Sequence, residues 1–213
     1  MQNKYASGHP IFDLVSPAVF YLLVANVLIY MYQSVDPSIV RHFGLWPLAE
    51  EGRWSGFKLW QLVSHGFLHA SNGHLLFNMF ALWMFGTPLE RLWGTRPFLL
   101  FYFVCLMGAA LIQLWVGGAS GPTIGASGAV FGLLMGFGMM YPNRKIMLIF
   151  LPIPIAAKYF VVLYGIVELT LGFTAERSTV AHFAHLGGML FGLLLILYWR
   201  GKFPIKPSRQ LMR

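Results

Sequence analysis

The chain of 213 residues is 57% hydrophobic and 10% charged, and its formal net charge is +8. Soluble domains carry roughly 25% charged residues, so this composition and a mean hydropathy of +0.65 exclude an ordinary soluble domain and indicate a polytopic membrane protein. The positive charge does not indicate a nucleic-acid partner, because five of the fifteen basic residues form a tail after the last apolar segment: Arg200, Lys202, Lys206, Arg209 and Arg213. Such a tail is typical of a cytoplasmic segment beside anionic lipid.

Apolar segments predict six membrane spans, since a helix needs about 20 residues to cross the hydrocarbon core. The expected fold is therefore all-α. We expect a cytoplasmic N-terminal segment at residues 1–16, a six-helix membrane domain at residues 17–199 and a basic cytoplasmic tail at residues 200–213. The stretch after residue 16 lacks a cleavage pattern and is interpreted as a retained helix. The predicted spans are residues 17–33, 74–93, 97–117, 127–141, 155–172 and 182–199.

Basic residues indicate the orientation of these spans. Ten lie on the side of the two termini and four on the other side, which favours both termini in the cytoplasm. We expect a multi-pass protein of a bacterial inner membrane. The first outer connection, residues 35–73, is long and rich in aromatic residues, which predicts a loop in the headgroup region; a small extramembrane subdomain is the alternative. Residues 145–154 contain Pro152 and Pro154, which disfavour helix, so a loop dipping into the interface is predicted there.

Polar side chains of three spans fall at one depth. Ser127 and His185 each lie about 15 residues before the cytoplasmic ends of their spans. His74 and Asn78 lie about 17 and 13 residues before Arg91. At about 1.5 Å per residue, all four are roughly 20–25 Å above the inner boundary of a core about 30 Å thick. Structural polar residues would scatter in depth, so a site just below the outer surface is predicted, with Ser127 as nucleophile and His185 as its base.

Glycines explain how these groups can meet. Glycine at every fourth position lets helix backbones approach closely, which a side chain as short as serine needs in order to reach a histidine. Plain helix packing is a compatible interpretation of the same pattern. Because Ser127 begins its span, free backbone N–H groups and the positive dipole end favour a developing oxyanion there. His74 and Asn78 are expected to donate from the facing helix. The glycines assigned to packing at the site are Gly125, Gly128, Gly132, Gly188 and Gly192.

These motifs resemble those of the rhomboid intramembrane serine proteases. G-x-S-G at residues 125–128 resembles the family's nucleophile motif, and H-x-x-x-N at residues 74–78 its oxyanion motif. A-H-x-x-G-x-x-x-G at residues 184–192 resembles its catalytic histidine motif, and G-x-x-x-E-x-x-x-G at residues 86–94 a further family stretch. The similarity covers residues 60–199 with the motifs in the family's order. It implies a rhomboid bundle with a Ser–His dyad, and neither metal nor cofactor.

Two positions depart from the family pattern. Trp60-Gln61 stands where the family usually has Trp-Arg, so the loop's usual charge contacts are not expected. Phe131, four residues after the serine, replaces a frequent tyrosine. Phenylalanine can stack on the catalytic histidine but cannot donate a hydrogen bond.

Two further polar residues are candidates without an assigned role. His182 precedes His185 by three residues, lies on nearly the same helix face and can compete as the base; the resemblance and its shallower depth favour His185. Glu168 falls within the fifth span, and an intramembrane carboxylate is a functional candidate by default. The favoured interpretation of Glu168 is a neutral or hydrogen-bonded structural residue.

The spacing of His65, His69 and His74 is compatible with metal ligands, but neither cysteines nor acids lie close by, so no metal site is predicted. Cys105 lies in an apolar run and is interpreted as a packing residue. The predicted function is cleavage of single-pass transmembrane substrates near the outer face, with substrate and membrane lipid as partners and no assigned oligomeric state. The alternatives are a non-catalytic rhomboid relative that binds membrane segments for quality control, and a transporter with a polar substrate path.

Overall fold

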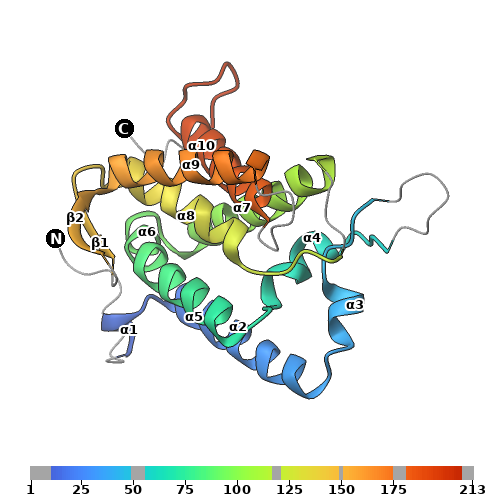
Figure 1. Ribbon diagram of the computed structural model, residues 1–213. Coiled ribbons are helices and arrows are strands. Elements are labelled where there is room, and N and C mark those ends of the chain that lie inside the picture. The colour runs from blue at the N-terminus through green and yellow to red at the C-terminus, as the bar shows by residue number, and fades with distance from the viewer. Residues whose placement is uncertain (1–10, 49–55, 117–120, 149–150, 175–180, 208–213) are drawn as a thin grey trace.

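The computed structural model describes residues 11–48, 56–116, 121–148, 151–174 and 181–207, and within them the fold is all-α apart from one hairpin (Figure 1). The elements in chain order are α1 (Ile11–Leu14), α2 (Pro17–Val35), α3 (Ile39–Phe43), α4 (Gln61–Ser64), the 3₁₀ turn η1 (His65–Phe67), α5 (Asn72–Ala81), the π-helical turn η2 (Leu82–Gly86), α6 (Thr87–Trp93), α7 (Thr95–Val116), α8 (Ser127–Met140), β1 (Lys145–Leu148), β2 (Leu151–Ala156), α9 (Ala157–Thr174) and α10 (His182–Trp199).

The six predicted spans are present as α2, α5–η2–α6, α7, α8, α9 and α10, with ends within two residues of the prediction. Within the described ranges, four of them (α2, α7, α9 and α10) are long and apolar enough to cross a membrane, and α8 is a shorter apolar helix. The second span contains a π-helical turn, η2, that the hydropathy pattern did not reveal. Such turns widen a helix locally and are frequent near functional sites.

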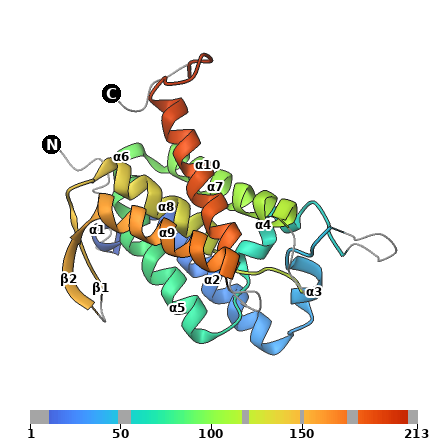
Figure 2. The same cartoon turned by 45° about the horizontal axis from the view of Figure 1, so that its top comes forward.

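Helices α7, α8 and α10 form the centre of the bundle, and α9 lies along α8 and α10 (Figures 1 and 2). Half of the residues in the α10 span are buried, against 22% of those in the α2 span and in the α9 span, so α2 and α9 are peripheral. Tight packing at the centre depends on glycine: a Cβ at Gly188 would collide with the backbone of Gly128, and one at Gly132 would collide with Cys105. Cys105 is buried there, as predicted for a packing residue.

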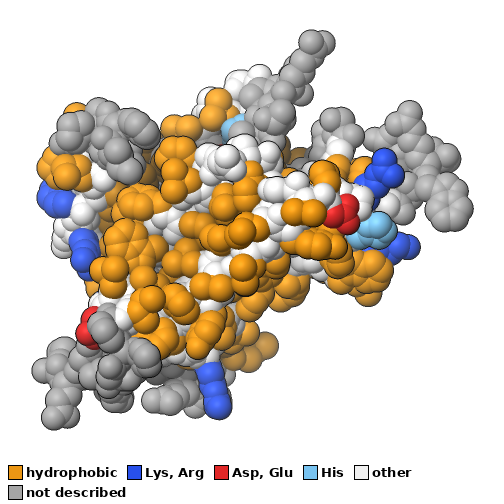
Figure 3. All heavy atoms as spheres, turned by 90° about the horizontal axis from the view of Figure 1, so that it is seen from below, with side chains coloured by type: hydrophobic (Ala, Val, Ile, Leu, Met, Phe, Trp, Pro, Cys, Tyr) orange, Lys and Arg blue, Asp and Glu red, His pale blue; other side chains and the backbone are white. Residues whose placement is uncertain are grey.

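The outer surface of the peripheral helices is apolar. Large side chains such as Leu28 and Met31 of α2 and Val162 and Ile166 of α9 are more than half exposed. Hydrophobic atoms cover the middle of the face in Figure 3, with basic side chains toward its edges. Water would make such a surface costly, whereas lipid solvates it. The protein is an integral membrane protein with several spans.

Residues 145–154 were predicted to form an interfacial loop, and this was wrong for the described part. Strands β1 and β2 pair in an antiparallel hairpin in which Ile146 faces Ile155 and Leu148 faces Leu151. The prolines of β2 are tolerated because a two-stranded sheet leaves one edge of each strand unpaired. The pairing register shifts between Ile146 and Leu148, so the regular pairing of the two strands is interrupted opposite Pro154.

The described part of the first outer connection folds onto the bundle. Gly66 packs against Leu106 of α7, and Leu45 pairs with Thr123 just before α8. Gln61 is the buried polar centre of this region. Its Oε1 accepts from the backbone N–H groups of Trp46 (3.3 Å) and Lys58 (3.1 Å), and its Nε2 donates to the carbonyls of His42 (3.1 Å) and Gly56 (3.2 Å). The neutral amide thus ties the loop together by hydrogen bonds.

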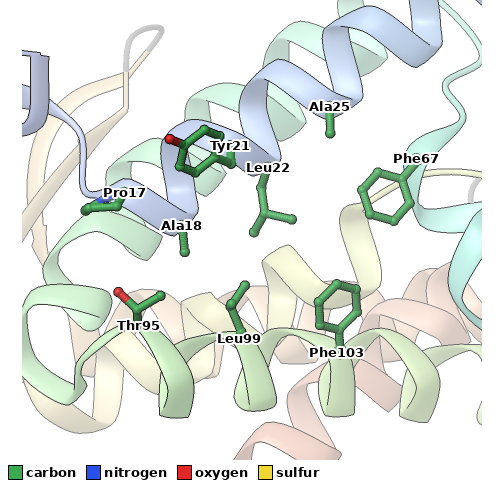
Figure 4. Close-up of a pocket in the computed structure, with 9 residues that line it drawn as sticks. All are labelled: Pro17, Ala18, Tyr21, Leu22, Ala25, Phe67, Thr95, Leu99 and Phe103. Carbon is green, nitrogen blue, oxygen red and sulfur yellow. The ribbon is translucent and has the colours of Figure 1, made fainter.

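A mainly apolar cleft of about 360 Å³ lies between α2 and α7, with Phe67 at one end (Figure 4). None of the residues predicted to form the site lines it. Its lining residues are Pro17, Ala18, Tyr21, Leu22, Ala25, Phe67, Thr95, Leu99 and Phe103.

Candidate active site

Ser127 is the first residue of α8. The loop before it is held by backbone hydrogen bonds to two other segments of the chain. Thr123 pairs with Leu45, and the Gly125 N–H donates to the His65 carbonyl at 2.9 Å. Gly125 has a φ of 128°, which L side chains rarely adopt, and an added Cβ would stand 2.8 Å from His74 Nε2. Its assignment to helix packing was therefore wrong. Gly125 lies before the helix and brings the backbone against the His74 ring.

Ser127 and His185 are in hydrogen-bond contact, with 2.8 Å between Ser127 Oγ and His185 Nε2. They come from α8 and α10. The two backbones lie in close contact at Gly128, one residue after Ser127, and Gly188, three residues after His185. The Gly132 and Gly192 positions continue the same interface one turn deeper: a Cβ on Gly192 would stand 3.2 Å from the Gly132 carbonyl. The glycine faces therefore set the helix separation at which so short a side chain reaches an imidazole.

Phe131 lies flat against His185, with ring centroids 4.1 Å apart and planes 8° from parallel. It is one turn beyond Ser127 on α8, so the same helix carries both the hydroxyl and the ring that face His185. Stacking on one face restricts rotation of the imidazole without using either of its nitrogens.

His74 lies against Gly125, two residues before Ser127, and is held by the start of α5. Ser71 caps that helix by accepting from the His74 N–H at 3.1 Å. His74 Nδ1 accepts from the Ala70 N–H at 3.3 Å, so a neutral ring carries its proton on Nε2. Cε1 and Nε2 are the ring atoms that lie against Gly125. His74 is thus a hydrogen-bond donor next to Gly125, in the loop that leads into α8.

Asn78 is buried one turn below His74, and its Nδ2 donates to the His74 carbonyl at 3.0 Å. An amide nitrogen has two hydrogens, so one donor position remains after this bond. Asn78 therefore steadies the turn that carries His74, and its amide keeps a second hydrogen for another acceptor.

Glu168 and His182 meet His185 from the far side, an arrangement that the sequence did not predict. Glu168 Oε2 lies 2.7 Å from His182 Nδ1 and 3.0 Å from His185 Nδ1. All three side chains are buried. His185 Nε2 is the imidazole nitrogen in hydrogen-bond contact with Ser127 Oγ, so the geometry favours His185 as the base. The sequence did offer a signal: a carboxylate within an apolar span, and two histidines on one face of another.

The histidines considered as metal ligands in the sequence lie elsewhere. His65 Nδ1 is 2.7 Å from the Gln61 carbonyl, and His69 packs between the rings of Tyr30 and His74. Burial lowers the pKa of His65 and of His69 to about 4, so both rings are neutral at pH 7. Among the described residues, the group whose ligand atoms come within 4.8 Å of one another is Glu168, His182 and His185.

Comparison with known proteins identifies the family of the chain. A family model described as the rhomboid domain matches residues 56–202. The chain is 29% identical over 209 residues to "Rhomboid protein 1, mitochondrial" of Saccharomyces cerevisiae, covering 91% of this chain and 59% of the relative. It is 32% identical over 148 residues to "Rhomboid protease GluP" of Bacillus subtilis, covering 68% of this chain and 26% of that relative. It is 28% identical over 200 residues to "Rhomboid-like protease 3" of Toxoplasma gondii, covering 90% of this chain and 72% of that relative. The chain thus spans 59% of the yeast relative and 26% of the Bacillus one. With the motif-bearing segments inside the matched region, the chain belongs to the rhomboid family.

Proposed function

We propose that the protein is an intramembrane serine endopeptidase that cleaves single-pass transmembrane proteins near the outer membrane face. The observation that carries the proposal is the 2.8 Å contact between Ser127 Oγ and His185 Nε2. A hydroxyl that donates to a neutral imidazole inside a membrane domain is arranged for proton transfer during nucleophilic attack. Two of the relatives are themselves named proteases.

In the proposed reaction, Ser127 Oγ attacks the scissile carbonyl while His185 Nε2 takes the hydroxyl proton. The carbonyl oxygen becomes an oxyanion, toward which His74 Nε2–H and the N-terminus of α8 are directed. His185 then gives the proton to the leaving amine, and an acyl-enzyme on Ser127 remains. Water, activated by the same imidazole, releases the second product and restores the serine.

The substrate is proposed to reach the site sideways, past α9. A transmembrane helix shields its peptide bonds, and freed backbone groups are costly in lipid. Cleavage is therefore expected near the outer face, where water and protein groups can replace the lost hydrogen bonds. Helix α9 suits this role because it is peripheral and only 22% buried.

Both termini are proposed to face the cytoplasm, from the distribution of basic residues. The bacterial inner membrane expected from the sequence is not supported, because relatives of this chain include proteins named as mitochondrial.

The proposal is tested with a fluorophosphonate probe and a single-pass reporter in the same vesicles. The probe is expected to label the wild-type protein at Ser127, and the wild-type protein is expected to cut the reporter near its outer end. The Ser127→Ala variant should neither take up the probe nor cut the reporter. A transporter or a non-catalytic membrane-segment binder would leave the reporter intact and the probe unreacted. An intact reporter or an unreacted probe with the wild-type protein refutes the proposal.

Asn78→Ala and His74→Ala are expected to lower kcat more than they raise KM. Each removes a donor that acts on the oxyanion, and loss of one such donor costs about 10²–10³ in kcat in other serine hydrolases. Steady-state cleavage of the reporter gives both constants. Asn78→Ala should have the smaller effect, since its amide also bonds the His74 carbonyl. An increase in KM alone would assign these residues to substrate positioning instead.

A further inference from the structure

A buried carboxylate joins α9 to both histidines of α10. Glu168 is 6% exposed, and one oxygen, Oε2, is 2.7 Å from His182 Nδ1 and 3.0 Å from His185 Nδ1. The His182 contact is a hydrogen bond, whereas the His185 contact has the distance of one but not its angle. His185 Nδ1 therefore has no hydrogen-bond partner among the described residues. Aligning it requires a rotation of the ring or of the carboxylate, and such bonds often tighten only when substrate binds.

The proposed base requires one tautomer of His185. Its Nε2 must be bare to accept the Ser127 proton, so the ring proton must be on Nδ1. Nδ1 is the atom beside Glu168. An ionised carboxylate there favours the Nδ1–H tautomer and stabilises the imidazolium that forms when Nε2 takes the serine proton, as the buried aspartate does in soluble Ser-His-Asp proteases.

His182 fixes the carboxylate itself. A carboxylate oxygen has two lone pairs, so Oε2 can accept from both histidines at once. Burying an unpaired carboxylate in a membrane domain is costly, and the bond from His182 Nδ1 offsets part of that cost. The His185 ring is then held by Ser127 at one nitrogen and by Phe131 across its face, with Glu168 at the other nitrogen.

The distances from Glu168 Oε2 to His182 Nδ1 and His185 Nδ1 favour hydrogen bonding over a shared metal ion. Ligand atoms around a tetrahedral zinc, each about 2.0–2.1 Å from it, are roughly 3.3 Å apart. The Glu168–His182 separation of 2.7 Å is hydrogen-bond length. A metal on His185 Nδ1 would also leave the proton on Nε2, where it could no longer accept from Ser127.

We infer that Glu168 is a positioning residue that completes a Ser127–His185–Glu168 series, with His182 holding the carboxylate in place. The inference rests on the proposed protease function. It assigns a third member to a reaction centre for which the sequence indicated only a serine and a histidine. A solely structural Glu168, fastening α9 to α10, makes different predictions.

The test measures kcat and KM for the reporter with Glu168→Gln and Glu168→Asp, per active site titrated to completion with the fluorophosphonate probe. Thermal unfolding of each variant is recorded alongside. Glu90→Gln is the matched control. Glu90 is likewise buried, but it accepts from Ser16 Oγ (2.5 Å), the Ala18 and Val19 N–H groups (both 3.0 Å) and Thr95 Oγ1 (2.7 Å), none of which belongs to the proposed site.

Glu168→Gln is expected to lower kcat by about 10²–10⁴-fold with KM within about twofold, by analogy with the soluble triad. Glu168→Asp, which keeps the charge, should recover part of the loss. Glu90→Gln should lower the unfolding temperature but keep kcat per titrated site. In ¹⁵N-histidine spectra, the wild-type His185 ring should be protonated on Nδ1, and Glu168→Gln should weaken that preference.

If Glu168→Gln unfolds at a lower temperature but keeps wild-type kcat per site, Glu168 is solely structural and the inference is overturned. A His185 ring protonated on Nε2 in the wild type would overturn it as well. If instead wild type cleaves no reporter and Ser127 takes no probe, the proposed function itself has failed, a result distinct from either of these.

Discussion

Ser127→Ala and His185→Ala are each expected to abolish cleavage, with a loss of about 10⁶-fold in kcat if the pair works as in soluble serine proteases. Alanine at position 127 removes the nucleophile, and alanine at position 185 removes the imidazole whose Nε2 lies 2.8 Å from the Ser127 hydroxyl oxygen. The two residues act as one unit, so the double variant should be no less active than either single one.

Cleavage of a single-pass reporter in vesicles, followed over long incubations, measures these residual rates. Circular dichroism and thermal unfolding should show that both variants remain folded, since each substitution only shortens a side chain. Near wild-type cleavage by Ser127→Ala would refute the mechanism, and additive losses in the double variant would show that the two residues act separately.

Gly188→Ala is expected to lower both stability and activity. The new Cβ would overlap the Gly128 backbone, which cannot rotate away as a side chain can. Overpacking of this kind costs typically about 1–3 kcal/mol, and relief requires α8 and α10 to separate. Because these helices carry Ser127 and His185, a shift of about 1 Å should also lower kcat about 10²-fold.

Gly165→Ala is the matched control for that substitution, because Gly165 is also a glycine inside a helix of the bundle. Its added Cβ would lie 3.4 Å from the end of the flexible Met189 side chain, an ordinary contact. Alanine favours helix over glycine by about 0.5–1 kcal/mol, so the control should unfold at an equal or higher temperature. If both variants behave alike in unfolding and in kcat, close approach at Gly188 does not position the site.

The spans were predictable because hydropathy acts locally. Each long apolar run must satisfy its backbone hydrogen bonds internally in lipid, so it becomes a helix whatever lies beside it. That reasoning failed at the β1–β2 hairpin, where Pro152 and Pro154 excluded helix but could not indicate which strand partner the chain would find. It also missed the π-helical turn at Leu82–Gly86, which composition alone does not encode.

The candidate site was predictable where depth and spacing carry information. Ser127 and His185 lie at matching distances from the ends of parallel spans, and glycines mark the helices that must approach. The Gly125 backbone was misassigned because its positive φ depends on how its loop is held by His65 and Leu45. Those contacts join residues far apart in the chain.

The sequence by itself determined the membrane class, the helical fold and the motif-bearing residues, since these follow from local hydropathy and periodicity. Only the tertiary structure decided what each polar group touches. Glu168 was an unassigned carboxylate in the sequence, and its contacts with His182 and His185 depend on the rotation of α9 about its own axis, which packing against α10 sets. Side-chain contacts between helices depend on such rotations and on separations of a few ångströms, and no single segment of the chain specifies either.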